Sequence, residues 1–246
     1  MAYRFEKLGK DTMIAVSDEH TFGTDAFLLA DFCGARHKDR VCDIGTGCGI
    51  IAVLIKLRYS PADITGIDIQ PQAIDQFRLT VEKSGFPDVH PLLCDVRCLD
   101  KTYNGVFDLV VSNPPYKAAN SGIESESASD KIARHETMLS VAELCTSAAK
   151  MLRFGGRFCM CCRPERLADT VCAMRENGIE PKRLRFVQKN SSSAPWLFLI
   201  EGRKGGKPFL QVEPALFMYS GDALNKNYLS EEMKTIYGNF AAAEVC

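Results

Sequence analysis

Strand-like and helix-like segments alternate along most of this chain, and that order constrains the fold more than any other feature. Apolar, β-branched runs predict strands at residues 41–44, 64–69, 89–94, 106–112 and 157–162. Amphipathic segments predict helices at 50–59, 71–84, 136–152 and 165–177, the third stopped by the turn Gly155-Gly156 and the fourth by Gly178. Alternation at this spacing predicts an α/β fold, with a parallel sheet covered by helices on both faces.

Two further strands are predicted at residues 183–187 and 196–201, joined as a hairpin by the polar loop QKNSSSAP. We therefore expect one domain over residues 41–204. A lead segment, 1–40, should pack on it, and residues 205–246 should extend the same domain, with Ser230 capping a short helix.

The composition is that of an ordinary globular protein, with 246 residues, 46% of them hydrophobic and 25% charged. These fractions exclude disordered, collagen-like and coiled-coil chains. We find no apolar run long enough to span a bilayer and no apolar signal core near the N-terminus, so we expect a cytoplasmic protein without a membrane partner.

The chain has 11 cysteines, an odd number that argues against a secreted disulfide framework. They form no paired C-x-x-C or Cys/His spacing of the kind that zinc requires, so we expect no metal. The run Cys159–Cys162 is predicted to be a buried strand of reduced thiols.

The net charge of -1 hides an asymmetry. Residues 150–207 carry 13 Lys and Arg against 5 Asp and Glu, a local charge of +8, and the remainder of the chain carries -9. A surface of +8 is either a solvated face or a site for nucleic-acid phosphates, and the charge alone does not decide between them.

A glycine-rich loop, Asp43-Ile-Gly45-Thr-Gly47-Cys-Gly49, leaves the first predicted strand of this series and enters a helix. Glycines there let a ligand approach the backbone closely. The third glycine falls one position too early for the dinucleotide fingerprint, which disfavours a pyrophosphate ligand. Asp68 ends the next strand, 25 residues after Asp43, where a carboxylate can hold the hydroxyls of an adenosine ribose. Asp95 follows the third strand.

The tetrad Asn113-Pro114-Pro115-Tyr116 directly follows the strand VFDLVVS. Its prolines fix φ and remove two backbone donors. The Asn113 side-chain oxygen and the Pro114 carbonyl can then both accept from one amino group, and the Tyr116 ring offers a flat surface for a planar substrate. A polar stretch, residues 117–134, follows at the strand's carboxyl edge, where open α/β sheets bind ligands.

The glycine loop resembles the D-x-G-x-G-x-G loop of class I S-adenosylmethionine-dependent methyltransferases, and the tetrad resembles the N/D-P-P-Y/F signature of members that methylate planar exocyclic nitrogens. Beyond the core, the segments Gly23-Thr24-Asp25-Ala26-Phe27-Leu28-Leu29, Ala133-Arg134-His135-Glu136 and EGRKGGK from Glu201 look like the bacterial tRNA (adenine-N6)-methyltransferase family. Characterised members of that family modify the adenine 3′ of the anticodon of a valine tRNA.

The resemblance implies a seven-stranded, mostly parallel Rossmann-like sheet with one antiparallel strand. It also implies direct methyl transfer from S-adenosylmethionine to the N6 of a tRNA adenine swung out of the anticodon loop. The residues that it assigns to catalysis are Asn113, Pro114 and Tyr116. Those that it assigns to the cofactor are Thr24, Asp43, Gly45, Thr46, Gly47, Gly49, Asp68, Ile69, Asp95, Val96 and Asn113. Those that it assigns to the tRNA are Tyr116, Lys117, Arg134, Lys204 and Lys207.

Three alternatives stay open. A protein glutamine N5-methyltransferase of the release-factor type uses the same tetrad, although such enzymes carry a helical domain for which the 42 residues before Asp43 leave no room. The second alternative is another methyltransferase, acting on an oxygen or nitrogen of a small molecule or on a nitrogen of rRNA. The third is a non-catalytic protein, either a cofactor-binding relic or an RNA-binding module. The sequence leaves open whether the chain is a monomer or a homodimer.

Overall fold

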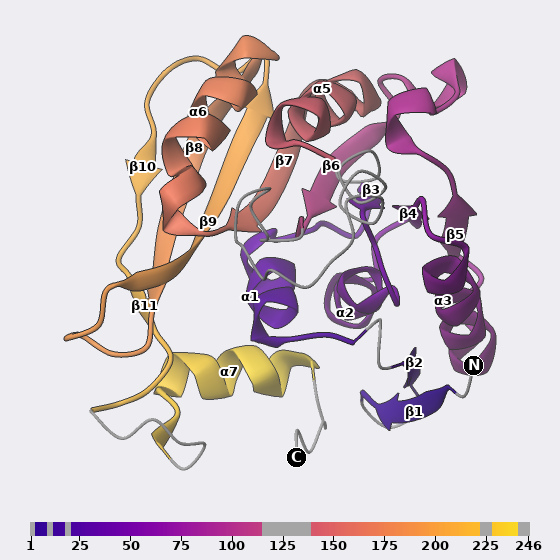
Figure 1. The fold of residues 1–246 in the computed structure, drawn as a ribbon, viewed down its shortest axis with the longest axis horizontal. Coiled ribbons are helices and arrows are strands. Elements are labelled where there is room, and N and C mark those ends of the chain that lie inside the picture. The colour runs from indigo at the N-terminus through magenta and orange to yellow at the C-terminus, as the bar shows by residue number, and fades with distance from the viewer. Residues whose placement is uncertain (1–2, 9–11, 18–20, 115–138, 222–227, 241–246) are drawn as a thin grey trace, which may run out of the picture.

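The computed structural model describes residues 3–8, 12–17, 21–114, 139–221 and 228–240 (Figure 1). Its centre is one twisted sheet flanked by helices. Among the described residues, no helix has both the length and the apolar character needed to cross a membrane.

The central sheet confirms the predicted fold class. Its strands within the described residues run in the order β10-β8-β9-β7-β6-β3-β4-β5, and β11 also pairs with β8. Only β9 runs antiparallel to its neighbours β7 and β8, as the predicted hairpin requires. The strand bounds are β3 Arg40–Ile44, β4 Asp63–Asp68, β5 Val89–Leu93, β6 Phe107–Ser112, β7 Leu152–Cys162, β8 Ile179–Gln188, β9 Pro195–Lys204, β10 Gln211–Val212 and β11 Leu216–Phe217.

Within the part of the chain that the structure describes, the sheet has nine strands where seven were expected. The two additional strands, β10 and β11, are two residues long and come from the extension after residue 204. Both pair in parallel with β8, so they lengthen the sheet at its edge without changing the order of the seven core strands.

Helices cover both faces of the sheet, as predicted (Figure 1). Buried side chains fall into two clusters, one per face. One face carries α1 (Thr24–Phe32), α2 (Ile50–Tyr59), α3 (Pro71–Ser84) and α7 (Glu231–Phe240). The other carries α5 (Val141–Met151) and α6 (Leu167–Glu176).

The segment Cys159–Cys162 is a buried part of β7, as predicted. Its side chains alternate between the two faces: Cys159 and Cys161 join one cluster, whereas Met160 and Cys162 join the other. A central strand that is buried on both faces reads as a continuous apolar run, which explains the sequence CMCC without a metal or a disulfide.

The helix predicted at 136–152 is shorter in the structure, where α5 spans Val141–Met151. Residues 136–138 lie outside the described residues, and α5 begins at Val141 because Ser140 and Glu143 form a capping box. The Ser140 hydroxyl accepts from the Glu143 amide at 3.2 Å, while the Glu143 carboxylate accepts from the Ser140 amide at 2.9 Å.

The turn predicted at Gly155-Gly156 was also wrong, because both glycines lie inside β7, which follows α5 directly at Leu152. They occupy an irregularity in that strand. Phe107 pairs with Leu152 but Leu109 pairs with Arg157, so the extra residues of β7 bulge at Gly155, whose φ is +77°.

The lead segment forms an antiparallel pair, β1 (Arg4–Lys7) and β2 (Met13–Val16), before α1 begins. Strand β2 is attached to α3 through buried hydrogen bonds. The Ala15 amide donates to Thr80 Oγ1 at 2.9 Å, and Gln76 Nε2 donates to the Ala15 carbonyl at 2.6 Å. The start of the chain is thereby fixed against the same face that carries α1 and α2.

The extension after β9 runs along the edge strand β8 and leads to α7, which packs near α1 and α2 (Figure 1). The predicted cap at Ser230 is confirmed, since its hydroxyl accepts from the Met233 amide at 3.1 Å. The same hydroxyl donates to the Phe217 carbonyl at 2.6 Å, which ties the start of α7 to β11.

Close packing against Phe77 explains why the third glycine of the glycine-rich loop, Gly49, has no side chain. Gly49 precedes α2 with a φ of +83°, and a Cβ placed on it would overlap the ring of Phe77 in α3. Gly85, which follows α3, also has a positive φ of +64°, but a Cβ there would meet no atom within 4 Å.

We expect Gly49→Ala to lower the free energy of unfolding by several kcal/mol, since it adds a steric clash to the cost of a left-handed alanine. Gly85→Ala is the matched control and should cost about 1–2 kcal/mol, the left-handed cost alone. Urea unfolding of both variants measures the difference. Equal losses would show that Phe77 does not constrain position 49.

Candidate functional site

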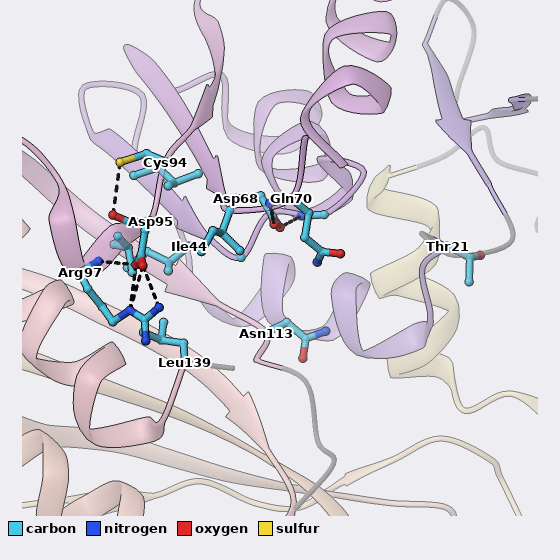
Figure 2. Close-up of a pocket in the computed structure, with 14 residues that line it drawn as sticks. Thr21, Ile44, Asp68, Gln70, Cys94, Asp95, Arg97, Asn113 and Leu139 are labelled. Carbon is cyan, nitrogen blue, oxygen red and sulfur yellow. Dashed lines mark hydrogen bonds and ion pairs between the residues drawn. The ribbon is translucent and has the colours of Figure 1, made fainter. Parts of the chain in front are cut away.

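A cavity of about 560 Å³ opens at the carboxyl edge of the parallel strands (Figure 2). Most of the residues that line it lie at or after the ends of four parallel strands, because β3, β4, β5 and β6 all end at this edge. Its lining residues are Ile44, Gly45 and Gly47 after β3, Ile67, Asp68, Ile69 and Gln70 at β4, Cys94, Asp95, Val96 and Arg97 after β5, Asn113 after β6, and Thr21 and Leu139.

The glycine loop lies against the end of β4. The amides of Gly45 and Thr46 both donate to the Ile67 carbonyl, at 2.8 and 3.0 Å. The Gly47 amide donates to Asp68 Oδ2 at 2.9 Å. Gly47 has a φ of +56° and a Cβ there would meet no atom within 4 Å, so the backbone itself forms this part of the cavity wall.

Asp68 lines the cavity at the end of β4 and organises the backbone around it. Its Oδ2 accepts from Gly47, and its Oδ1 accepts from the Gln70 amide at 3.0 Å (Figure 2). The carboxylate therefore fixes the glycine loop relative to the start of α3 while one side of it faces the cavity.

Asp43 does not line the cavity. It is fully buried beneath the loop, where its Oδ2 accepts from the Thr46 hydroxyl at 2.7 Å. Its Oδ1 has no hydrogen-bond partner among the described residues. Burial, together with a smaller contribution from the negative charge of Asp68, raises the pKa of this carboxyl to about 7, although the Thr46 hydrogen bond acts in the opposite direction.

Asp95 lies on the cavity wall but is already paired. Its Oδ1 accepts from the Arg97 amide at 2.9 Å, and its Oδ2 forms an ion pair with the Arg97 guanidinium at 2.7 Å (Figure 2). The hydrogen bonds from Arg97 lower the pKa of the Asp95 carboxyl. Arg97 also reaches Glu143 of α5 at 3.5 Å, so the pair joins this wall to the next helix.

Asn113 follows β6 and faces the cavity from the side opposite Asp95 (Figure 2). Its Nδ2 donates to Asp25 Oδ2 of α1 at 2.8 Å, and its Oδ1 accepts from the Cys161 thiol of β7 at 3.1 Å. The level of β6 is fixed by Ser112, whose hydroxyl donates to the Ile44 carbonyl at 2.8 Å.

The structure brings together seven of the residues expected to bind a cofactor: Gly45, Gly47, Asp68, Ile69, Asp95, Val96 and Asn113. The other four do not line the cavity. Asp43 and Thr46 bond each other below the loop, Gly49 packs against Phe77, and the Thr24 hydroxyl bonds the Tyr237 hydroxyl of α7 at 3.0 Å. Pro114 is described, whereas Pro115, Tyr116, Lys117 and Arg134 lie outside the described residues.

Lys204 and Lys207 lie at the opposite edge of the sheet from the cavity. Lys204 Nζ donates to the carbonyl of Leu152, the first residue of β7, at 2.7 Å. The Lys207 carbonyl accepts from Lys182 Nζ at 3.0 Å, near the start of β8. The amino ends of the parallel strands meet at that edge, so these lysines are not brought together with Asn113.

Much of the excess positive charge between residues 150 and 207 is neutralised within the fold. Arg157 is buried and pairs with Asp39 at 2.9 Å and with Glu201 at 3.5 Å. Arg183 pairs with the same Glu201 and with Glu213, and Arg153, Arg175 and Arg185 pair with Asp108, Glu180 and Glu232. Four of these acidic partners, Asp39, Asp108, Glu213 and Glu232, lie outside residues 150–207, so they offset part of the local charge of +8.

Among the described residues, no group of three or more His, Cys, Asp or Glu side chains is placed to hold a metal ion. The residues missed from the sequence are Thr21, Ile44, Ile67, Gln70, Cys94, Arg97 and Leu139 in the wall, and Asp25 and Cys161 around the Asn113 amide. Asp25 lies within the segment Gly23–Leu29 singled out above, but nothing in the sequence connects it to Asn113.

The raised pKa of Asp43 predicts a pH dependence of stability in the protein without ligand. A carboxyl whose pKa rises from 3.8 to about 7 on folding favours the folded state below pH 4, and this contribution is lost as the pH rises towards 7. Asp43→Asn should therefore raise the free energy of unfolding at pH 8, by up to about 4 kcal/mol, with a gain that shrinks towards pH 5.

Asp100→Asn is the control for this measurement, because hydrogen bonds from Thr102 lower the pKa of that exposed carboxyl. It should bring no gain at pH 8. Urea unfolding from pH 5 to pH 8 gives all three curves, and a constant difference between wild type and Asp43→Asn across this range would contradict the assignment.

The structure is similar to solved methyltransferases. A predicted O-methyltransferase from Agrobacterium tumefaciens superposes with a TM-score of 0.72 at 17% identity, over 89% of this chain and 98% of that one. A geranyl diphosphate methyltransferase in complex with SAM gives 0.55 at 13%, over 73% and 84%. The M. jannaschii tRNA m1G37 methyltransferase gives 0.54 at 16%, over 83% and 57%. At these identities the similarity shows the fold.

Curated relatives named tRNA1(Val) (adenine(37)-N6)-methyltransferase are similar in sequence. The relative from Porphyromonas gingivalis is 29% identical over 80% of this chain and 83% of its own length. The one from Pseudoalteromonas translucida is 28% identical over 63% and 66%, and the one from Yersinia pestis strain Pestoides F is 34% identical over 56% and 56%. The match to the last two thus spans less than two thirds of their own length.

The family model of the methyltransferase small domain matches residues 17–176, which include the glycine loop, Asp68, Asp95 and Asn113. These are the segments that form the cavity at the carboxyl edge of the sheet. The chain therefore belongs to the methyltransferase small domain family.

Proposed function

We propose that this enzyme transfers a methyl group from S-adenosylmethionine to the exocyclic N6 of an adenine in tRNA. The observation that carries the proposal is the position of Asn113, an amide on the wall of a cavity that is otherwise suited to a nucleoside. The names of the curated relatives support the acceptor, and point to the adenine 3′ of the anticodon in a valine tRNA.

The cavity residues fit S-adenosylmethionine. Gly45 and Gly47 leave open space where side chains would stand, so an extended chain can lie against the loop. The Asp68 carboxylate can accept from both hydroxyls of a ribose, and the apolar side chains of Ile69 and Val96 can enclose an adenine ring. Asp95 is the acceptor for the adenine amino group, a contact that it would share with Arg97.

When bound, S-adenosylmethionine supplies a methyl group already activated by a positively charged sulfur. The chain's own residues then have to orient the acceptor nitrogen and exclude water, the contribution of proximity. Asn113 Oδ1 and the Pro114 carbonyl accept the two amino hydrogens of the target adenine, which leaves the nitrogen lone pair directed at the methyl group. We retain Tyr116 as the stacking residue and Lys117 and Arg134 as contacts to the tRNA.

Besides Arg97, which is paired with Asp95, the carboxyl edge carries exposed basic groups that differ from the two lysines expected from the sequence. Arg163 and Arg166 follow the carboxyl end of β7, and Lys189 follows that of β8. All three are exposed. The Arg163 guanidinium lies over the Trp196 ring at 6.0 Å, an arrangement that also suits contact with RNA. We propose that tRNA phosphates bind here, on the same edge as Asn113.

Asn113→Ala should lower the rate of methyl transfer to unmodified valine tRNA by at least about 100-fold, the usual loss when a positioned polar group at the reacting centre is removed. Calorimetry should show S-adenosylmethionine binding with little change, because most of the expected cofactor contacts lie on the glycine loop, Asp68 and Asp95, and Asn113 is one of several others. A variant that binds the cofactor and methylates at the wild-type rate would overturn the assignment of Asn113.

Lys189→Glu should weaken tRNA binding several-fold at low salt, and make the plot of log affinity against log salt concentration shallower by about 1. Lys207→Glu is the matched control, since it is an exposed lysine at the opposite edge. Filter binding over a salt series compares them. A larger effect of Lys207→Glu would contradict this proposal and would indicate that tRNA binds at the opposite edge of the sheet.

A further inference from the structure

The Asn113 amide is held from both ends by groups that distinguish its nitrogen from its oxygen. Asp25 Oδ2 accepts from Nδ2 at 2.8 Å, and the Cys161 thiol donates to Oδ1 at 3.1 Å. A carboxylate only accepts, so an Asn113 rotated by 180° about its amide would face Asp25 with its oxygen and lose the hydrogen bond. The pair therefore selects one orientation of the amide.

Asp25 is itself fixed in place. It lies in the first turn of α1, and its Oδ1 accepts from the Ala26 amide at 3.1 Å. A Cβ on the preceding Gly23 would lie 2.8 Å from that oxygen, so a larger residue there would displace the carboxylate. The opposite partner, Cys161, is a buried residue of β7.

We propose that Asp25 is a positioning residue that keeps Oδ1 of Asn113 directed as an acceptor and strengthens it. The carboxylate polarises the amide through the Nδ2 hydrogen bond, which increases the negative charge on Oδ1. An amide oxygen has two lone pairs, so Oδ1 accepts from Cys161 with one and from an acceptor amino group with the other. The inference rests on the proposed function for its substrate.

In this arrangement a residue of the lead segment, Asp25, contacts the amide that binds the acceptor nitrogen. Asp25 is 88 residues from Asn113 in the sequence, and α1 crosses the face of the sheet so that its first turn reaches the carboxyl edge (Figure 1). The other acidic residue of α1, Asp31, lies near its far end and forms an ion pair with Arg58 of α2. Asp31 is therefore a matched carboxylate on the same helix with a purely structural contact.

The test compares Asp25→Asn with Asp31→Asn in the full chain, using unmodified valine tRNA and S-adenosylmethionine. Asp25→Asn should lower kcat about 10-fold, with KM for tRNA and the calorimetric Kd for S-adenosylmethionine within about twofold of wild type, because the side chain polarises the amide rather than binding either ligand. Asp31→Asn should leave kcat unchanged, whatever it does to thermal stability.

A double-mutant cycle separates positioning from a structural effect. If Asp25 acts through the amide, adding Asp25→Asn to Asn113→Ala should change the residual rate no further. A wild-type kcat in Asp25→Asn, additive losses in the double variant, or a parallel loss of kcat and cofactor binding would each overturn the inference.

A spectroscopic measurement keeps the inference testable without the proposed substrate. The side-chain amide signals of Asn113, assigned by their loss in Asn113→Ala, should shift upfield in Asp25→Asn as the charged acceptor is removed, and stay in place in Asp31→Asn. Unchanged signals in Asp25→Asn would overturn the inference. A wild-type protein that binds S-adenosylmethionine and methylates no tRNA would overturn the proposed function, and this shift would still decide the role of Asp25.

Discussion

The parallel pairing of β3 with β4 and with β6 is the constraint on which the site depends. Ile44 pairs with Ile67 on one side and with Ser112 on the other, so the three strands end at the same level. The residues that follow them, the glycine loop, Asp68 and Asn113, therefore meet around one cavity although they are distant in the sequence. A shift of either register would separate the amide from the glycine loop.

The segments outside this core also contribute to the site. Strand β2 is fixed to α3 by Thr80 and Gln76, and α1 then crosses the sheet and brings Asp25 to Asn113. At the other end of the chain, Tyr237 of α7 bonds Thr24, the residue before Asp25. Helix α7 thus packs against the first turn of α1, which positions the carboxylate that contacts the Asn113 amide.

The features of the fold and site that could be predicted from the sequence are those that local sequence patterns determine. The strands and most helices follow from periodicity, and the glycine loop with Asp68 follows from its order after two strands. Asp25, Arg97 and Cys161 could not be found, because their roles are contacts between elements far apart in the sequence. The position of Lys204 could not be predicted either, because a local charge of +8 says nothing about which edge of the sheet carries it, or which acidic groups neutralise it. Its contact with tRNA stays a prediction.

The central claim is that the cavity at the carboxyl edge directs methyl transfer to an adenine amino group of tRNA. The most direct measurement incubates the purified chain and S-adenosylmethionine carrying a deuterated methyl group with total tRNA and protein from cells lacking this gene. Mass spectrometry then locates the label. The account predicts deuterated N6-methyladenosine in tRNA, confined to one position and absent with Asn113→Ala. Label on a glutamine side chain, with tRNA unlabelled, would contradict it.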